Sequence, residues 1–179
     1  MRQTLLHQTL RLHPDSLCAA VTQIEADIVR PRPGSLILSY VLSGRINDLR
    51  CPPVVVPARA DELWRHTCFE AFVRGSADPG YYEFNFSPST QWAVYRFDSY
   101  RSGMRVATEI GAPRIEVRSD EATFTLQAAL ELDGLSSPLH LGLTAVLEET
   151  SGRKSYWALT HPPGKADFHH ADCFALELS

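Results

Sequence analysis

Apolar and polar residues alternate along much of the chain. The clearest case is the segment 123–132, in which the apolar side chains occupy every second position: Phe124, Leu126, Ala128, Leu130 and Leu132. The segments 35–43 and 139–147 have the same period. Because a period of two places alternate side chains on opposite faces of an extended chain, each segment is predicted to be a β-strand with one buried face.

Further segments have the length and composition of strands: 20–29, 67–74, 81–87, 91–98, 114–118, 155–161 and 173–178. Turn-forming residues separate them, for example at Pro31–Gly34 and Gly75–Gly80. Only 58–65 is expected to form a short turn of helix. Short strands at this spacing predict an all-β fold, namely a two-sheet antiparallel β-sandwich of the jelly-roll kind. We expect residues 1–179 to form one such domain.

Composition narrows the partners that this fold would bind. The chain of 179 residues has 21 acidic and 17 basic side chains, a net charge of −4, and no basic run. Nucleic acid and anionic membranes are therefore not expected partners. Polar residues interrupt the apolar ones in 1–14, so no signal peptide is predicted there. We expect a cytoplasmic protein whose four cysteines are free thiols.

The segment 63–101 is predicted to form three consecutive antiparallel strands. Its second and third strands are joined by a tight turn, which would set their register. Centring that turn between Pro88 and Ser89 gives three cross-strand pairs: Asn85 with Trp92, Glu83 with Val94, and Tyr81 with Arg96. Glu70, on the first strand, would lie roughly across from Glu83.

This register places several chemically useful groups on one face of the sheet. They are an indole, a carboxamide, a guanidinium and two carboxylates, from Trp92, Asn85, Arg96, Glu83 and Glu70. Such a set suits a sugar, because the ring stacks on the C–H face while the polar groups bind the hydroxyls. The alternative is an ordinary exposed face, with Trp92 at the edge of the core and a cross-strand ion pair between Glu83 and Arg96.

Other candidate residues lie outside this face. Trp64 and Trp157 could form a second stacking pair, with His66 and His161 beside them. His161 also belongs to a group near the C-terminus that invites a metal or haem interpretation: His161, His169, His170, Asp172 and Cys173. Its spacing matches no strong zinc signature, so we assign no metal ligand and predict no cofactor.

The two glutamates suggest a further alternative. A pair of carboxylates roughly 5–9.5 Å apart suffices for glycoside hydrolysis, and Glu70 and Glu83 could form one. Nothing in their spacing distinguishes them from the other glutamates of the chain. We therefore assign no catalytic residue.

Three segments resemble the DOMON-like proteins that are related to family 9 carbohydrate-binding modules. They are LWRHTCFEAFV, YYEFNFSPSTQWAVYRFDSYRSGM and YWALTHPPGKADFHHADCFALEL. The resemblance implies a jelly-roll-like β-sandwich with a ligand site on one sheet face. In the related modules two Trp rings hold a terminal sugar, so the resemblance suggests Trp92 and Trp157 as aromatic counterparts. It suggests Glu70, Asn85 and Arg96 as polar ones. Other DOMON relatives bind haem through axial Met or His, for which Met104 and the loop histidines are the candidates here.

Our leading hypothesis is therefore non-catalytic binding of a small carbohydrate-like or other polar ligand. The ligand would be a soluble sugar or sugar derivative. The predicted ligand-binding residues are Trp64, His66, Glu70, Glu83, Asn85, Trp92, Arg96, Trp157 and His161. Three alternatives stay open: a haem- or metal-binding domain, a glycan-acting enzyme using the paired carboxylates, and a sandwich whose exposed sheet face forms a homodimer.

Overall fold

The computed structural model describes residues 4–179, which form β-strands joined by loops and short 3-10 helices. The strands are β1 Thr4–Leu12, β2 Val21–Arg30, β3 Ser35–Gly44, β4 Cys68–Gly75, β5 Tyr81–Phe86, β6 Trp92–Phe97, β7 Arg105–Val106, β8 Arg114–Ser119, β9 Thr123–Glu131, β10 Leu139–Glu148, β11 Lys154–Ala158 and β12 Leu176–Leu178. The helices are η1 Ile46–Asp48, η2 Leu63–Arg65 and η3 Ala171–Cys173. None of the helices in 4–179 is long and apolar enough to cross a membrane.

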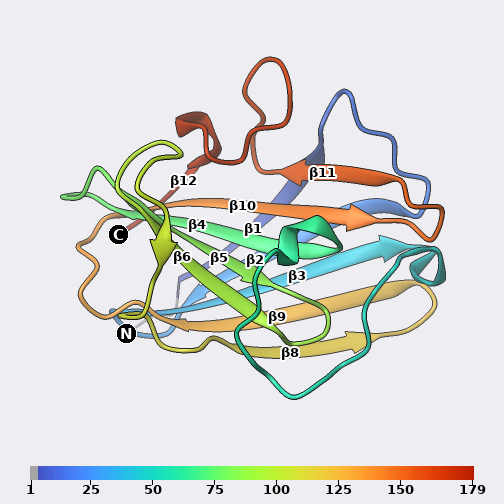
Figure 1. Cartoon of the computed structure of the whole chain (residues 1–179), viewed down its shortest axis with the longest axis horizontal. Helices are drawn as coiled ribbons and strands as arrows, with labels where there is room; N and C mark the ends of the chain where they lie inside the picture. Colours follow the sequence, from blue (N-terminus) through green and yellow to red (C-terminus); the bar gives the residue numbers. More distant parts are fainter. Residues whose placement is uncertain (1–3) are drawn as a thin grey trace.

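The strands pair antiparallel in one continuous sheet that curls back on itself (Figure 1). Its order is β7-β6-β5-β4-β10-β11-β1-β2-β3-β9-β8, and β12 adds to β10. β1 makes the bend, because it pairs with β2 along most of its length and with β11 at its end, where Leu12 lies opposite Trp157. We call β1, β2, β3, β9 and β8 the first half-sheet, and the remaining strands the second half-sheet.

The two half-sheets pack face to face around an apolar core. The Phe69 ring of β4 lies 5.1 Å from the Tyr40 ring of β3 and 5.8 Å from the Phe124 ring of β9, measured between ring centroids. The Tyr40 hydroxyl donates a 2.7 Å hydrogen bond across the core to the Glu70 carbonyl oxygen. The predicted all-β class and sandwich packing are thereby confirmed, whereas the jelly-roll connectivity stays a prediction.

The alternating segments became strands because one face of each could be buried. Leu36, Leu38, Tyr40 and Leu42 of β3 are fully buried, and their neighbours in sequence are only partly so. The sequence pattern missed β1, in which Leu5 is exposed and Gln8 lies on the inward-facing side, so that the period is obscured. The helical turn predicted in 58–65 is confined to η2.

The predicted register between β5 and β6 is wrong by one residue. Phe86 lies opposite Trp92, and Glu83 lies opposite Tyr95. The turn is longer than a tight hairpin, since the Ser87 amide bonds to the Gln91 carbonyl oxygen at 2.9 Å. A slip of one residue moves every side chain of a strand to the other face. The indole and guanidinium of β6 therefore point away from the face on which they were predicted.

Candidate functional site

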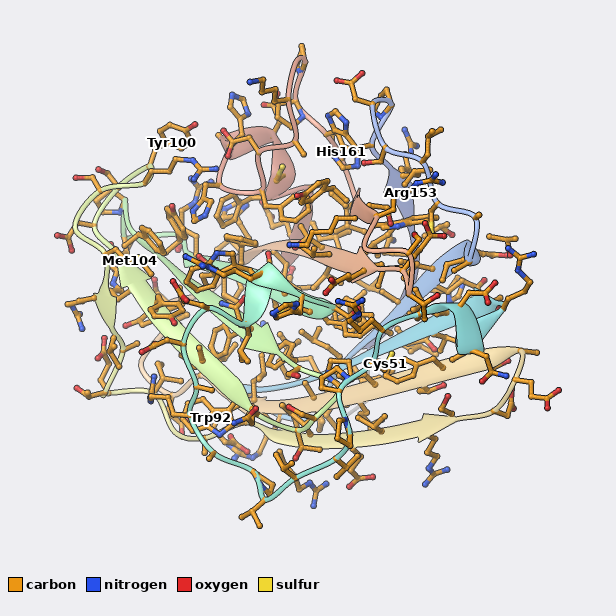
Figure 2. All side chains as sticks on the ribbon, turned by 45° about the vertical axis from the view of Figure 1, so that its right-hand side comes forward. Cys51, Trp92, Tyr100, Met104, Arg153 and His161 are labelled. Atoms are coloured by element: carbon orange, nitrogen blue, oxygen red, sulfur yellow. The ribbon has the colours of Figure 1, made fainter. Side chains whose placement is uncertain are left out.

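A cavity of about 420 Å³ opens on the outer face of the second half-sheet. Its floor is formed by the strands, through Glu70 of β4, Glu83 of β5 and Val146 of β10. Its walls come from η2, from the loop 98–104 after β6, and from the loop 159–170 after β11. In Figure 1 the 159–170 loop, in dark orange and red, rises beside β10 and β11. Figure 2 labels Tyr100 and Met104 in the 98–104 loop.

The strands place the two carboxylates by simple alternation. Glu70 lies opposite Asn85 on β5 and opposite Thr144 on β10, and Glu83 is two residues from Asn85. All four side chains therefore share the outer face. The structure therefore has Glu70, Glu83 and Asn85 on one face, as predicted. Their placement depends on β4 and β5 and not on the register of β6.

The floor is a buried polar network. Thr144 Oγ1 donates to Glu70 Oε2 at 3.1 Å, and Asn85 Nδ2 donates to Glu83 Oε1 at 2.9 Å. The Cys68 thiol donates to Asn85 Oδ1 at 3.5 Å. Glu70 is 3% exposed and Glu83 is 5% exposed. The donors therefore leave part of each carboxylate available to a group that enters the cavity.

Burial strongly affects the protonation of both acids. It raises the pKa of Glu70 well above its usual range, the negative charge of Glu83 raises it further, and the Thr144 hydrogen bond lowers it less. Burial also raises the pKa of Glu83 to about 6, against the lowering effects of the Asn85 hydrogen bond and the Arg101 charge. The floor can therefore hold a proton under conditions in which exposed glutamates are ionised.

A histidine and an arginine face the cavity from the two loops. Tyr81 Oη lies 2.7 Å from His169 Nδ1 and accepts a hydrogen bond from the Arg101 amide at 3.2 Å. We therefore assign the Tyr81 hydrogen to Nδ1, which places the imidazole proton on Nε2, 3.6 Å from Glu83 Oε2. Burial lowers the pKa of His169 to about 4, so the ring is neutral near pH 7. The Arg101 guanidinium is paired with Asp167 at 2.7 Å.

Aromatic side chains form much of the remaining wall. The Trp64 ring contacts Tyr95 edge to face at a centroid distance of 5.8 Å. The Tyr156 ring of β11 and the Phe168 ring of the 159–170 loop also line the cavity, at a centroid distance of 6.1 Å. These side chains belong to a second apolar cluster that covers the outer face of the half-sheet. Rings beside buried hydrogen-bond acceptors are the surroundings that a sugar requires.

The 159–170 loop and η3 approach the sheet closely because β10 has a glycine beneath them. A Cβ atom added at Gly142 would lie 2.7 Å from the Cys173 carbonyl oxygen. Any larger residue at this position would push the backbone after the loop away from the strand. The wall carrying Phe168 and His169 therefore depends on this close contact.

Of the nine predicted ligand-binding residues, three line the cavity and a fourth supports it. Trp64, Glu70 and Glu83 contribute to the lining, and Asn85 holds Glu83 from beside it. The remaining five lie elsewhere: His66, Trp92, Arg96, Trp157 and His161. Whether the residues of the lining contact a ligand stays a prediction.

Trp92 and Arg96 are turned away from the cavity by the register of β6. Trp92 is 8% exposed in the core between the half-sheets, where the Arg59 guanidinium carbon lies 4.4 Å from its ring centroid. Arg96 bonds Asp78 at 2.6 Å and stacks on Tyr82. Figure 2 shows Trp92 at the opposite end of β6 from the 98–104 loop. The prediction that they share a face with Asn85 is wrong.

The other three predicted ligand-binding residues outside the cavity form hydrogen bonds with other parts of the protein. Trp157 is 4% exposed in the core and donates from Nε1 to Ser155 Oγ at 3.0 Å, so it forms no stacking pair with Trp64. His66 Nδ1 lies 2.7 Å from Glu148 Oε2, and its side chain is 64% exposed. His161 Nε2 bonds the Arg11 carbonyl oxygen at 2.8 Å.

Pattern reasoning did not assign several of the lining residues to a ligand site. Phe97 would have been found with the correct register, since it follows Tyr95 on the outward face of β6. Arg101, Tyr156 and Phe168 come from two loops and a short strand. The only signal for them was the presence of long loops near the predicted face, and no local pattern shows where a loop folds.

The histidines do not gather into a metal centre. Within residues 4–179, no group of three or more His, Cys, Asp or Glu side chains is placed to hold a metal ion. His170 caps η3 by accepting a bond from the Asp172 amide. Met104 and His169 both line the cavity, but Tyr81 engages His169 Nδ1 and two carboxylates form the floor. An apolar haem ring with an axial imidazole does not fit these residues.

The sequence and the structure were compared with those of known proteins, and only the structural comparison found matches. No family model and no curated protein matches the sequence. A proposed carbohydrate-binding protein from Bacteroides uniformis is similar in structure, with a TM-score of 0.65, 14% identity, and coverage of 98% of this chain and 87% of that one. A family 9 carbohydrate-binding module from Caldicellulosiruptor kristjanssonii, in complex with glucose, has a TM-score of 0.49 and 11% identity. The match covers 87% of this chain and 76% of that one. At 14% identity, the likeness to the first of these structures shows a shared fold.

Proposed function

We propose that the chain binds a small carbohydrate, without catalysis, in the cavity on the outer face of the second half-sheet. The observation that carries this proposal is the cavity itself, with its aromatic walls and a floor of two buried carboxylates. A volume of about 420 Å³ is within the range of small-molecule sites. The fold shared with a proposed carbohydrate-binding protein supports the same conclusion.

In this proposal each wall of the cavity has a role. The apolar face of a sugar ring packs against Trp64 or Tyr156, because C–H groups and aromatic faces are complementary. Hydroxyl groups donate to Glu70 and Glu83 at the floor. The Nε2 proton of His169 is available to an oxygen of the ligand.

Substitution of Trp64 tests this proposal. Trp64→Ala is expected to weaken sugar binding by about tenfold or more, since a ring stacked on a ligand contributes roughly 1–3 kcal/mol. The stability of the free protein is expected to change little, because Trp64 is only partly buried. Binding would be measured by calorimetric titration with a panel of mono- and disaccharides, and stability by urea unfolding.

Trp64→Phe serves as the matched control. It keeps an aromatic face in the wall and is expected to retain most of the affinity. If the wild-type protein bound no sugar of the panel, or if Trp64→Ala bound as well as wild type, the proposed function would be rejected.

A glycan-acting enzyme is the second candidate, because the structure brings Glu70 and Glu83 into one cavity. Burial holds the proton of Glu70 more strongly than that of Glu83, and glycoside hydrolysis requires one acid and one base or nucleophile. Aryl glycosides that release a chromophore would test this candidate. Turnover by wild type that Glu70→Gln and Glu83→Gln both abolish would establish it, and absence of turnover would leave the binding function alone.

A further inference from the structure

We propose that the preferred ligand of the cavity is a sugar that carries a protonated amino group. This inference rests on the proposed function and specifies its ligand class. The ammonium group would sit at the floor between Glu70 and Glu83, and the sugar ring would lie against the aromatic wall.

The charged side chains around the cavity do not balance one another. Glu70 and Glu83 both contribute carboxylates, and Arg101 is the guanidinium of the lining. Arg101 is already paired with Asp167 at 2.7 Å. Lys165, next to the lining residue Ala166, is exposed and forms no ion pair with the described residues. Near pH 7, above the pKa of about 6 of Glu83, the floor therefore carries negative charge that the surrounding side chains do not balance.

The hydrogen-bond partners of the two acids are neutral side chains. Among residues 4–179, the side chain that bonds the Glu70 carboxylate is the neutral hydroxyl of Thr144, and Glu70 forms no ion pair. Glu83 is bonded by the neutral amide of Asn85 and faces His169, which is uncharged near pH 7. A buried carboxylate without a cationic partner is costly to the folded protein. A cationic ligand would supply the missing partner.

The groups around the floor favour one type of cation. The sites of Ca²⁺ and Mg²⁺ require several oxygen ligands in a defined geometry. Residues 4–179 contain no group of three or more Asp, Glu, His or Cys side chains placed to hold a metal ion. Aromatic rings such as Trp64 and Tyr156 stand near the carboxylates instead, and the faces of aromatic rings attract organic cations. An ammonium group therefore suits the floor better than a metal ion. The hydrogen-bonding groups of Arg101 and His169 leave room for the hydroxyls of a sugar.

Proton binding by the floor gives the inference a pH dependence. The titratable and charged groups that face the two acids on the outer face are Cys68, Tyr81, Tyr95, Arg101 and His169, and Tyr40 adjoins Glu70 from the core. The pKa of Glu83 is about 6. Protonation of Glu83 removes a charge that attracts the ammonium group. Affinity for an amino sugar is therefore expected to fall as the pH is lowered through about 6, and affinity for a neutral sugar is not.

The experiment compares ligands that differ only in charge. Calorimetric titrations at pH 7 would use glucosamine, galactosamine and mannosamine, together with the matching neutral hexoses and N-acetylated amino sugars. N-acetylation keeps the nitrogen and removes its positive charge. At least one amino sugar is expected to bind about tenfold more tightly than both of its uncharged counterparts, since a charge-assisted hydrogen bond is roughly twice as strong as a neutral one.

Substitutions of the two floor acids test whether the preference for the amino sugar arises at the floor. Glu70→Gln and Glu83→Gln are expected to reduce the preference for the amino sugar to about threefold or less. Glu83→Gln removes a negative charge, Glu70→Gln removes a carboxyl group that can give up its proton to become one, and both keep the shape. Glu121→Gln, on the exposed surface, is the control and is expected to keep the wild-type preference. Circular dichroism would check that each variant is folded. The comparison of ligands on the wild-type protein does not depend on any variant.

The outcomes separate the two proposals. Equal or tighter binding of the uncharged sugars would overturn the amino-sugar inference and leave carbohydrate binding in place. A preference that survives both floor variants would also overturn it. If no sugar of the panel bound, the proposed function and this inference would both fail.

Discussion

At the scale of single residues, the molecule carries two acids in surroundings that disfavour their charged forms. Glu70 and Glu83 lie on a sheet face whose other members are largely aromatic or aliphatic, and their hydrogen-bond donors there are neutral. Burial raises the pKa of each. The protein therefore bears a cost in stability at the floor of the cavity, as is common at functional sites.

This cost predicts how stability depends on pH. Because the pKa of Glu83 in the folded protein is raised, its contribution to stability is fully present below the unfolded-state pKa of about 4.5 and is lost as the pH rises through about 6. The loss amounts to about 2 kcal/mol. Glu83→Gln has no such carboxyl and should lack this loss, so that the variant gains stability relative to wild type between pH 4.5 and pH 7.

Urea unfolding at several pH values would measure the difference between the two proteins. His161 and His169, whose pKa values are lowered, also make stability depend on pH. They are present in both proteins, so their effects cancel when the stability of one protein is subtracted from that of the other. Glu121→Gln, which is exposed, should follow the wild-type profile. If the stability of wild type and that of Glu83→Gln changed in parallel with pH, folding would not raise the pKa of Glu83.

At the scale of elements, the turn between β5 and β6 decides which side chains reach the cavity. The segment 87–91 carries Thr90 with φ of 72° and is closed by the bond from the Ser87 amide to the Gln91 carbonyl oxygen. This loop aligns Glu83 with Tyr95 and sends Trp92 into the core. One residue fewer would have exchanged the two faces of β6.

The position of Trp92 predicts a loss of stability and not a loss of binding. Trp92→Ala removes a large side chain from the core and leaves Arg59 without its stacking partner, so it is expected to destabilise the protein by about 3–5 kcal/mol. Sugar affinity of the folded fraction should be close to wild type. Urea unfolding and calorimetric titration below the unfolding midpoint would measure the two effects. If Trp92→Ala were as stable as wild type but bound no sugar, this prediction would be contradicted and the Trp92 indole would belong to the ligand site.

At the scale of the whole molecule, closure of the sandwich depends on pairs of strands that are distant in sequence. β1 bridges the half-sheets by pairing with β11, and β4 pairs with β10, with Glu70 opposite Thr144. The cavity is built from β4, β5, β6, β10 and β11, from η2, and from the loops that follow β6 and β11. It therefore exists only when most of the second half-sheet is assembled.

This topology predicts slow folding. Non-local pairing requires loop closure before native contacts form, and β-sandwiches of this kind fold in roughly milliseconds to seconds. Stopped-flow fluorescence would follow the burial of Trp92 and Trp157, both of which lie in the core. Complete folding within microseconds would indicate that local structure, and not the pairing of distant strands, limits the rate.

The sequence by itself determined the class of fold and part of the site. The alternation in 35–43, 123–132 and 139–147 is a local property, and one buried face of a strand follows from it directly. The same rule placed Glu70, Glu83 and Asn85 on one face, because β4 and β5 each keep a regular period. None of these conclusions requires knowledge of a distant part of the chain.

Only the tertiary structure decided which other groups meet the two carboxylates. The register of β6 depends on the conformation of a loop, so the sequence pattern predicted Trp92 and Arg96 on the wrong face. Arg101 and His169 reach the cavity on loops that are held there by long-range contacts, including the bond between Tyr81 and His169. Such contacts leave no periodic trace in the sequence, because the partners lie far apart along the chain and are joined only when the sheet is complete.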